Sequence, residues 1–267
     1  MTAGAGQVLV VGGAKGIGLA TARDLVSAGY RVAVWDNDVA ALGRLGHGFA
    51  TAALDITNRS AVADALKMLR SAGALRAAVI AAGIHASCPG EFLPDAVLDR
   101  IMNVNFTAHA KLARDLVPLM VKGGRIIGVS SIAASVGMPM SAAYSASKAA
   151  LEAFYASLTS DLRHKSIWPV IVQPGNVNTG FNETGNDFAS NDDARVATTY
   201  RAVVETIHSR NGMPPTDVAA VICQAIAAPR PKFLYVVGRN AQRANLARRL
   251  LGYNGALYFV RRHFGIS

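Results

Sequence analysis

The stretch Gln7-Val-Leu-Val-Val-Gly-Gly-Ala-Lys-Gly-Ile-Gly18 decides the fold of this chain of 267 residues. Its first five residues form an apolar run of strand length, and Gly12, Gly16 and Gly18 then follow with the spacing G-x-x-x-G-x-G. The residues from 16 to 28 have the pattern of a helix. Glycines between a strand and a helix let the backbone approach a pyrophosphate, which the unpaired N–H groups of the helix then bind. The stretch predicts a βα unit with a nucleotide-binding turn.

Outward from this unit, short β-rich runs alternate with amphipathic segments of helix length. The expected strands cover residues 31–35, 49–54, 75–81, 125–130, 167–172 and 232–237. The expected helices cover residues 59–71, 94–121 with a break near 103–106, 142–165 and 215–228, and two short basic helices close the chain. Continuous apolar strands in this order are typical of an α/β fold, a parallel sheet that helices cover on both faces.

Composition excludes several classes of protein. With 51% hydrophobic and 16% charged residues, the chain is not expected to be disordered. Cys88 and Cys223 are too few for a disulfide scaffold and lack metal-site spacing, so we expect no metal and a reducing, cytoplasmic setting. No apolar run reaches membrane-spanning length, and the N-terminus lacks the basic region of a signal peptide.

The net charge of +10 is concentrated at the C-terminal end. From Pro229 onward there is no Asp or Glu, and there are eight basic residues: Arg230, Lys232, Arg239, Arg243, Arg248, Arg249, Arg261 and Arg262. The other 228 residues hold 19 basic and 17 acidic residues. This tail is either a solvated arginine face or a surface for an anionic membrane or substrate. Nucleic-acid binding is not expected, because no aromatic and basic platform accompanies the charge.

Two charged residues beside the glycine turn bear on the choice of nucleotide. Asp36 ends the second expected strand, where a carboxylate can accept hydrogen bonds from both ribose hydroxyls and repel a 2′-phosphate. Lys15 favours the opposite choice, since a cation can pair with a 2′-phosphate. Asp36 is given more weight, and NAD is therefore expected over NADP, which stays open as an alternative. The alternative role for Asp36 is to cap the next helix, which Asp38 fills as well.

Tyr144-Ser-Ala-Ser-Lys148 places a phenol and an amine on one face of a helix, one turn apart. A tyrosine with a pKa near 10 is a poor base at neutral pH, but a nearby ammonium and a cationic nicotinamide would together lower that pKa and make it a general acid/base. The pair alone is common on exposed helices. Its context is more informative, because Ser131, Asn105 and the run 174–179 all lie near the carboxyl ends of expected strands, where such sheets bind ligands.

These motifs together resemble the short-chain dehydrogenase/reductase family, over residues 7–240. The resemblance implies one Rossmann-type, doubly wound sheet that forms a dinucleotide-binding catalytic domain at residues 1–240. A substrate lid is expected at about 180–213, and residues 241–267 are expected to be a basic helical extension.

The resemblance also implies catalytic roles. Tyr144 would move the proton and Lys148 would hold the nicotinamide ribose. Ser131 would donate a hydrogen bond to the substrate oxygen, and Asn105 would hold a water that relays protons. The implied cofactor contacts are Gly12, Lys15, Gly16, Ile17, Gly18, Asp36, Asp55, Ile56, Ala82, Gly83, Tyr144, Lys148, Pro174, Gly175, Val177 and Thr179. The implied substrate contacts are Ser131, Met138, Tyr144 and Phe181.

The expected activity is therefore hydride transfer between NAD(H) and a hydrophobic secondary alcohol or ketone. The alternatives are an NADP-dependent carbonyl reductase and a non-catalytic nucleotide-sensing protein. The C-terminal extension is similar to those of family members that act on steroids, retinoids or other lipid-like alcohols. It would rest on an anionic membrane surface, cover the substrate entrance or pack on a second subunit. A homodimer or homotetramer is expected from the family.

Overall fold

The computed structural model describes residues 6–180, 198, 200, 203 and 212–266. Its centre is a seven-stranded sheet in the order β3-β2-β1-β4-β5-β6-β7, with every neighbouring pair parallel. The strands are β1 (Gln7–Val11), β2 (Arg31–Asp36), β3 (Phe49–Ala53), β4 (Leu75–Ile80), β5 (Met120–Val129), β6 (Trp168–Pro174) and β7 (Leu234–Val237). The strand order runs outward in both directions from β1 and β4. The predicted doubly wound, Rossmann-type sheet is therefore confirmed.

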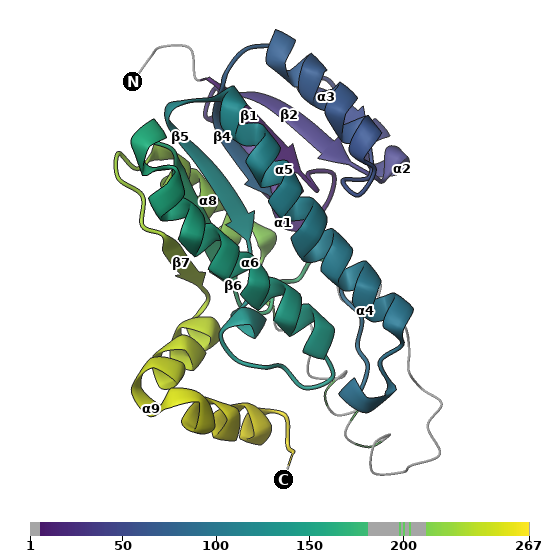
Figure 1. The fold of residues 1–267 in the computed structure, drawn as a ribbon, viewed down its shortest axis with the longest axis vertical. Helices are drawn as coiled ribbons and strands as arrows, with labels where there is room; N and C mark the ends of the chain where they lie inside the picture. Colours follow the sequence, from purple (N-terminus) through teal and green to yellow (C-terminus); the bar gives the residue numbers. More distant parts are fainter. Residues whose placement is uncertain (1–5, 181–197, 199, 201–202, 204–211, 267) are drawn as a thin grey trace.

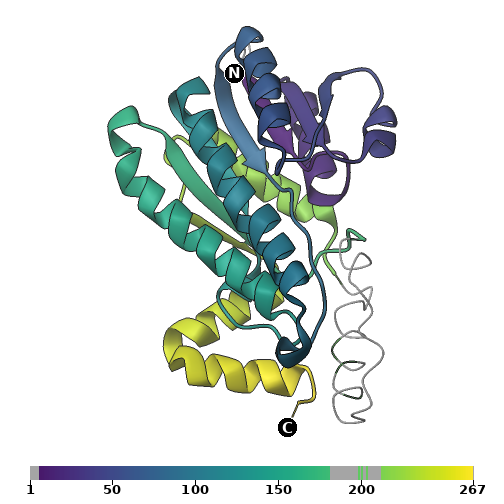
Figure 2. The ribbon, with the colours of Figure 1, turned by 45° about the vertical axis from the view of Figure 1, so that its right-hand side comes forward.

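Helices cover both faces of this sheet (Figures 1 and 2). They are α1 (Gly16–Ser27), α2 (Val39–Gly43), α3 (Arg59–Ser71), α4 (Asp95–Met102), α5 (His109–Leu116), α6 (Ala142–Asp161), α8 (Pro215–Ala227) and α9 (Arg239–His263). In Figure 1, α3, α5 and α6 lie in front of the strands, and α1 and α8 lie behind them.

The alternating side chains of β1 divide the core into two layers. Leu9 and Val11 pack into one buried cluster with residues of α3, α5 and α6, whereas Val8 and Val10 pack into the other with residues of α1 and α8. All four side chains are at most 1% exposed. A central strand that is buried on both faces must be apolar throughout, which is why this run carries no alternation of polar residues.

The expected break near residues 103–106 is a π-helical segment at Asn103–Ala108, between α4 and α5. The helix expected to reach residue 121 instead ends in a 3₁₀ turn at Val117–Leu119, which contains Pro118. The strand expected from residue 125 begins at Met120, because Met120 pairs with Leu75 of β4 before the register shifts. Both boundaries were predicted wrongly, since this pairing with a distant strand overrides the local pattern.

The C-terminal extension is helical, as predicted, and α9 has a kink at Gly252 that divides it into two segments. It follows β7 and lies beyond the carboxyl ends of the strands, at the bottom of Figure 1. No helix among the described residues is both long and apolar enough to cross a membrane. The extension is therefore placed next to the end of the sheet where a ligand site is expected.

Candidate active site

A large cavity of about 1790 Å³ runs along the carboxyl ends of the strands, from the glycine turn to α9. It is lined by all the residues expected at the cofactor: Gly12, Lys15, Gly16, Ile17, Gly18, Asp36, Asp55, Ile56, Ala82, Gly83, Tyr144, Lys148, Pro174, Gly175, Val177 and Thr179. Ser131 and Met138 also line it, whereas Phe181 and most of the expected lid lie outside the described residues. The topology thus brings residues from β1 through β6 into one continuous wall.

The glycine turn is packed so closely that side chains are excluded from it. Gly12 has a φ of +72°, and a Cβ there would lie 2.6 Å from the backbone nitrogen of Ala82. A Cβ on Gly18 would lie 2.0 Å from the carbonyl oxygen of Gly12. The helix α1 then begins after Lys15, whose side chain does not cap it. The uncapped N–H groups beside a cradle without side chains fit the pyrophosphate of a dinucleotide.

The carboxylate of Asp36 lines the same end of the cavity and is held by backbone donors. One oxygen accepts a hydrogen bond from the N–H of Ala14 at 2.9 Å, and the other accepts one from Asp38 at 3.0 Å. Asp38 forms an ion pair with Lys15 and caps α2 by accepting a hydrogen bond from Ala41. The Lys15 hydrogen bond lowers the pKa of the Asp38 carboxyl. The helix cap is therefore Asp38, and the charge of Lys15 is engaged by it.

The Tyr144 and Lys148 side chains both reach the cavity from α6. Lys148 is 3% exposed, its Nζ donates to the carbonyl of Val129 at 2.9 Å, and it lies 5.7 Å from the centre of the Tyr144 ring. Burial lowers the pKa of Lys148 to about 8. Burial also raises the pKa of Tyr144 to about 12, although a hydrogen bond with Ser131 lowers it in part.

The pKa of Tyr144 is raised in this structure, and the lowering expected from Lys148 together with a bound cationic nicotinamide stays a prediction. The loss of water around the phenol outweighs the neighbouring groups, and the Nζ of Lys148 is directed to a backbone carbonyl. A phenol with a pKa of about 12 carries its proton at neutral pH. At neutral pH Tyr144 is therefore an acid in this structure and not a phenolate.

Asn105 lies behind the cavity wall, fully buried in the π-helical segment. Its Oδ1 accepts from the N–H of Ile84 at 2.8 Å, and its Nδ2 donates to the Ile84 carbonyl and to Ser147. These bonds hold the chain after β4 against α6. The Asn105 amide therefore positions the chain after β4 relative to α6. The water relay expected of Asn105 stays a prediction.

The far end of the cavity is lined by α4 and by α9, the extension for which a cover over the substrate entrance was one expected role. The helix α4 contributes the apolar Val97 and Ile101 and the basic Arg100, and α9 contributes the apolar Ala247, Phe259 and Val260 beside the basic Arg243 and Arg262. Residues of α9 form part of the cavity lining, and all three roles considered for the C-terminal extension stay predictions. No local signal in the sequence places α9 beside this cavity, because α4 and α9 come to line it only through the tertiary fold.

His85 also lies in this wall, although it resembles an ordinary loop histidine in the sequence. It is 7% exposed, and its ring contacts Tyr144 edge-on with 5.0 Å between ring centres. Its Nε2 is 3.0 Å from the Oγ of Ser141. Within the part of the chain that the structure describes, no group of three or more His, Cys, Asp or Glu side chains is arranged to hold a metal ion.

A second group that the sequence analysis missed is a polar network behind Lys148. Glu152, one turn after Lys148 on α6, accepts hydrogen bonds from Ser130 at 2.7 Å and from Gln173 at 2.8 Å. Gln173 in turn accepts from Asn245 of α9 at 3.2 Å. The spacing of four residues between Lys148 and Glu152 was visible in the sequence, but the contacts from β6 and α9 were not.

Comparison with known proteins assigns the class to which this arrangement belongs. A family model described as short chain dehydrogenase matches residues 7–189, and the chain belongs to this family, the short-chain dehydrogenases/reductases. A 3-ketodihydrosphingosine reductase of Bacteroides thetaiotaomicron is 30% identical over 69% of this chain and 71% of its own. Estradiol 17-beta-dehydrogenase 2 of Mus musculus is 28% identical over 88% of this chain and 68% of its own.

Solved structures support the same assignment. A short-chain dehydrogenase from Streptomyces avermitilis superposes with a TM-score of 0.82 at 25% identity, covering 98% of this chain and 96% of its own. BdcA in complex with NADPH has a TM-score of 0.72 at 25% identity, with coverages of 88% and 93%. A Burkholderia phymatum member in complex with NAD shares the fold, with a TM-score of 0.79 at 22% identity and coverages of 92% and 93%. The chain is an oxidoreductase of this family that uses NAD(P) and acts on a CH–OH or carbonyl group.

Proposed function

We propose that this protein transfers hydride between NAD(H) and a hydrophobic secondary alcohol or ketone, with Tyr144 as the general acid/base. The observation that carries the proposal is the juxtaposition of Tyr144, Ser131 and Lys148 with the apolar end of one cavity. A carbonyl held there would have its polar end at the hydroxyl groups and its hydrocarbon among the side chains of α4 and α9. Adaptable apolar walls with a few convergent polar groups are typical of such pockets.

The residues at the reacting end have complementary tasks. Ser131 would donate a hydrogen bond to the substrate oxygen and so stabilise the negative charge that develops there. In ketone reduction, the O–H proton of Tyr144 would pass to that oxygen, and in alcohol oxidation the proton would return. The ammonium of Lys148, charged below about pH 8, would offset the charge left on Tyr144 and hold the nicotinamide ribose. The nicotinamide, when bound, supplies or accepts the hydride.

The dinucleotide would extend from this point to the glycine turn. The pyrophosphate would face Gly12, Gly16 and Gly18 at the N-terminus of α1. The remaining contacts would come from the other cofactor-expected residues that line the cavity: Lys15, Ile17, Asp36, Asp55, Ile56, Ala82, Gly83, Pro174, Gly175, Val177 and Thr179. We propose NAD rather than NADP, because Asp36 would repel a 2′-phosphate while the ion pair with Asp38 engages Lys15.

A lipid-like substrate is favoured by the apolar end of the cavity. Two relatives, a 3-ketodihydrosphingosine reductase and an estradiol 17-beta-dehydrogenase, carry names that indicate large apolar substrates for those proteins. The test is a panel of hydrophobic alcohols and ketones of increasing size, offered with NAD(H) and NADP(H) in parallel. We expect turnover that rises with the apolar size of the substrate and is faster with NAD(H). Equal turnover of short polar alcohols would contradict the substrate class, and faster NADP(H) turnover would contradict the cofactor.

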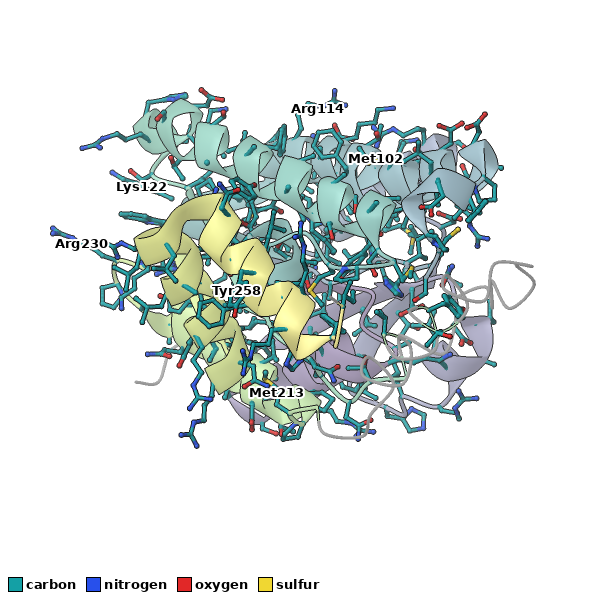
Figure 3. All side chains as sticks on the ribbon, turned by 90° about the horizontal axis from the view of Figure 1, so that it is seen from below. Met102, Arg114, Lys122, Met213, Arg230 and Tyr258 are labelled. Atoms are coloured by element: carbon teal, nitrogen blue, oxygen red, sulfur yellow. The ribbon has the colours of Figure 1, made fainter. Side chains whose placement is uncertain are left out.

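We also propose that the outer face of α9 rests on an anionic membrane surface. Of the twelve exposed large apolar side chains of the described chain, six lie on α9, and five of these do not line the cavity: Leu246, Leu250, Leu251, Tyr253 and Tyr258. They alternate with arginines in a segment without acidic residues. In the view from below, α9 lies in front of the rest of the molecule (Figure 3). A cationic face with exposed apolar side chains fits a bilayer interface, whereas a second copy of the same face would repel it.

Vesicle co-sedimentation tests this surface. The intact protein should pellet with phosphatidylglycerol vesicles and far less with phosphatidylcholine vesicles. Replacement of Leu246, Leu250 and Leu251 by Asn should reduce pelleting several-fold. The matched control replaces Val39 and Met68, which are exposed apolar residues elsewhere, and should pellet like the wild type. Equal pelleting of both variants would refute the assignment.

A homodimer or homotetramer stays a prediction from the family. A shallow groove between α5 and α6, lined by Val117, Phe154 and Leu158 among others, supports contact through these helices. Sedimentation velocity would give the assembly directly, and a monomer at micromolar concentration would contradict the expectation.

A further inference from the structure

Lys148 is a charged group in a buried position, and the structure shows little nearby to balance it. The side chain is 3% exposed, and its Nζ donates to the carbonyl of Val129. None of the ion pairs in the described part of the chain includes Lys148. Burial of an ammonium is costly unless an opposite charge is near, and the cost is avoided by loss of the proton.

The titratable groups around Lys148 come from two helices. His109 of α5 is fully buried, and burial keeps the pKa of its ring well below the usual 6.5, so it is neutral at pH 7. Tyr144 of α6 is protonated at that pH. The remaining group is Glu152, whose negative charge raises the pKa of Lys148 against the effect of burial. At the end of β5 the carbonyl of Val129 accepts from Lys148, and just after the strand the hydroxyl of Ser130 donates to Glu152.

The carboxylate of Glu152 is itself held in one orientation. It is partly buried on α6, and one oxygen accepts hydrogen bonds from both Ser130 and Gln173. Such bonds favour the charged form of a carboxyl group, and they oppose the rise in the Glu152 pKa that burial causes. The two hydrogen bonds thus fix a half-buried glutamate one helical turn after Lys148 on α6.

Gln173 extends this arrangement to the C-terminal helix. It is fully buried at the end of β6, and its Nε2 donates to both Glu152 and Ser135. Its Oε1 accepts from the Nδ2 of Asn245 on α9. If α9 moved away, this buried oxygen would lose its protein partner, which is costly for a group shielded from water. The seating of α9 and the orientation of Glu152 are thus linked through one amide.

We propose that Glu152 is the counter-charge of Lys148, a positioning residue that keeps the lysine protonated in the working pH range. Gln173 holds the glutamate for this task, and Asn245 fixes Gln173 from α9. The helix that closes the substrate end of the cavity thereby also sets the charge at the reacting end. This inference rests on the proposed role of Lys148 at the nicotinamide ribose.

The test is the pH dependence of NADH binding to the full chain, which requires no substrate. The dissociation constant is measured by energy transfer from protein tryptophan, since Trp35 lines the cavity. For the wild type, binding should weaken as the pH rises through about 8, where Lys148 loses its charge. In Glu152→Gln, the midpoint of this loss should fall by at least about half a pH unit.

Two further variants test whether the shift of the midpoint depends on the negative charge at position 152. Glu152→Asp keeps the negative charge, and the pH midpoint of its NADH binding should lie between those of Glu152→Gln and the wild type. Asp161→Asn removes a negative charge from an exposed position on the same helix, and its curve should match the wild type. If Glu152→Gln does not fold, Asn245→Ala provides the test from α9 and should shift the midpoint in the same direction by a smaller amount.

The outcomes separate this inference from the proposed function. A Glu152→Gln curve that superposes on the wild type, or an equal shift in Asp161→Asn, would overturn the counter-charge. A wild-type curve that is flat between pH 7 and 9 would also overturn it, by showing that the charge of Lys148 does not act on the cofactor. Absence of turnover with any alcohol or ketone would refute the proposed function alone, because binding is measured without a substrate.

Discussion

Asp36 and Ala14 are joined by a hydrogen bond of 2.9 Å, from the backbone N–H in the glycine turn to the carboxylate at the end of β2. This bond ties together the two elements that would meet opposite ends of an adenosine diphosphate. The other carboxylate oxygen of Asp36 accepts a hydrogen bond from the backbone N–H of Asp38. Both oxygens of the carboxylate are therefore held by the protein itself. A negative charge held in this way is well placed to discriminate between ribose hydroxyls and a 2′-phosphate.

The first prediction concerns this discrimination. Asp36→Asn removes the charge but keeps one acceptor for the turn. The ratio of kcat/KM for NADP to that for NAD should rise at least about tenfold, because the repulsion of the 2′-phosphate is lost. Asp64→Asn, an exposed change on α3, is the control and should leave the ratio unaltered. An unchanged ratio in Asp36→Asn would mean that Asp36 does not face the ribose.

The second prediction concerns the tight packing of the glycine turn. Gly18→Ala would place a methyl group 2.0 Å from the Gly12 carbonyl, so the turn must shift. We expect a loss of about 1–3 kcal/mol in the free energy of unfolding, and weaker NADH binding. Gly43→Ala is the matched control, since nothing lies within 4 Å of its added Cβ and alanine favours the helix. Chemical denaturation would measure the free energy of unfolding of both variants. Equal values for Gly18→Ala and Gly43→Ala would contradict the account.

The third prediction concerns acid stability. His109 is buried against Tyr155, with 2.9 Å between Nε2 and the hydroxyl, and burial lowers its pKa well below 6.5. The unfolded chain binds a proton there below pH 6.5, whereas the folded chain does not. Stability from this site is therefore present above pH 6.5 and falls by up to about 1.4 kcal/mol per pH unit below it.

Substitution of this histidine should flatten that slope. His109→Gln keeps a polar partner for Tyr155 but does not titrate. The pH dependence of its unfolding free energy between pH 6.5 and 5 should be shallower than that of the wild type. The exposed change His47→Gln should leave the slope unaltered. If His109→Gln keeps the full wild-type slope, another group is responsible for the acid sensitivity.

The sequence predicts the features that depend on contiguous residues. The run from Gln7 to Gly18 is enough to place a buried strand, a turn and a helix, because the pattern and the function are local. Tyr144 and Lys148 are likewise one helical turn apart. The start of β5 at Met120 was missed, since its pairing with Leu75 lies far away in the sequence.

The site contacts that the sequence did not predict also join residues that are far apart in the chain. The contact of Asn245 with Gln173 joins residues 72 positions apart, and no periodicity or motif announces it. The rise in the Tyr144 pKa was also not visible in the sequence, because it is caused by burial, which is a property of the folded environment. The sequence can predict which residues carry out the chemistry, because this depends on residue type. Their pKa values depend on burial and on neighbouring groups, which only the structure shows.

The most direct test of the central claim is the turnover of Tyr144→Phe, measured beside its affinity for NADH. The substitution removes one hydroxyl and keeps the ring, so the cavity and the cofactor contacts should persist. The account predicts an NADH dissociation constant within about threefold of the wild type and a kcat reduced by about 100-fold to 10,000-fold. A variant that binds NADH and turns over within tenfold of the wild type would show that another group moves the proton.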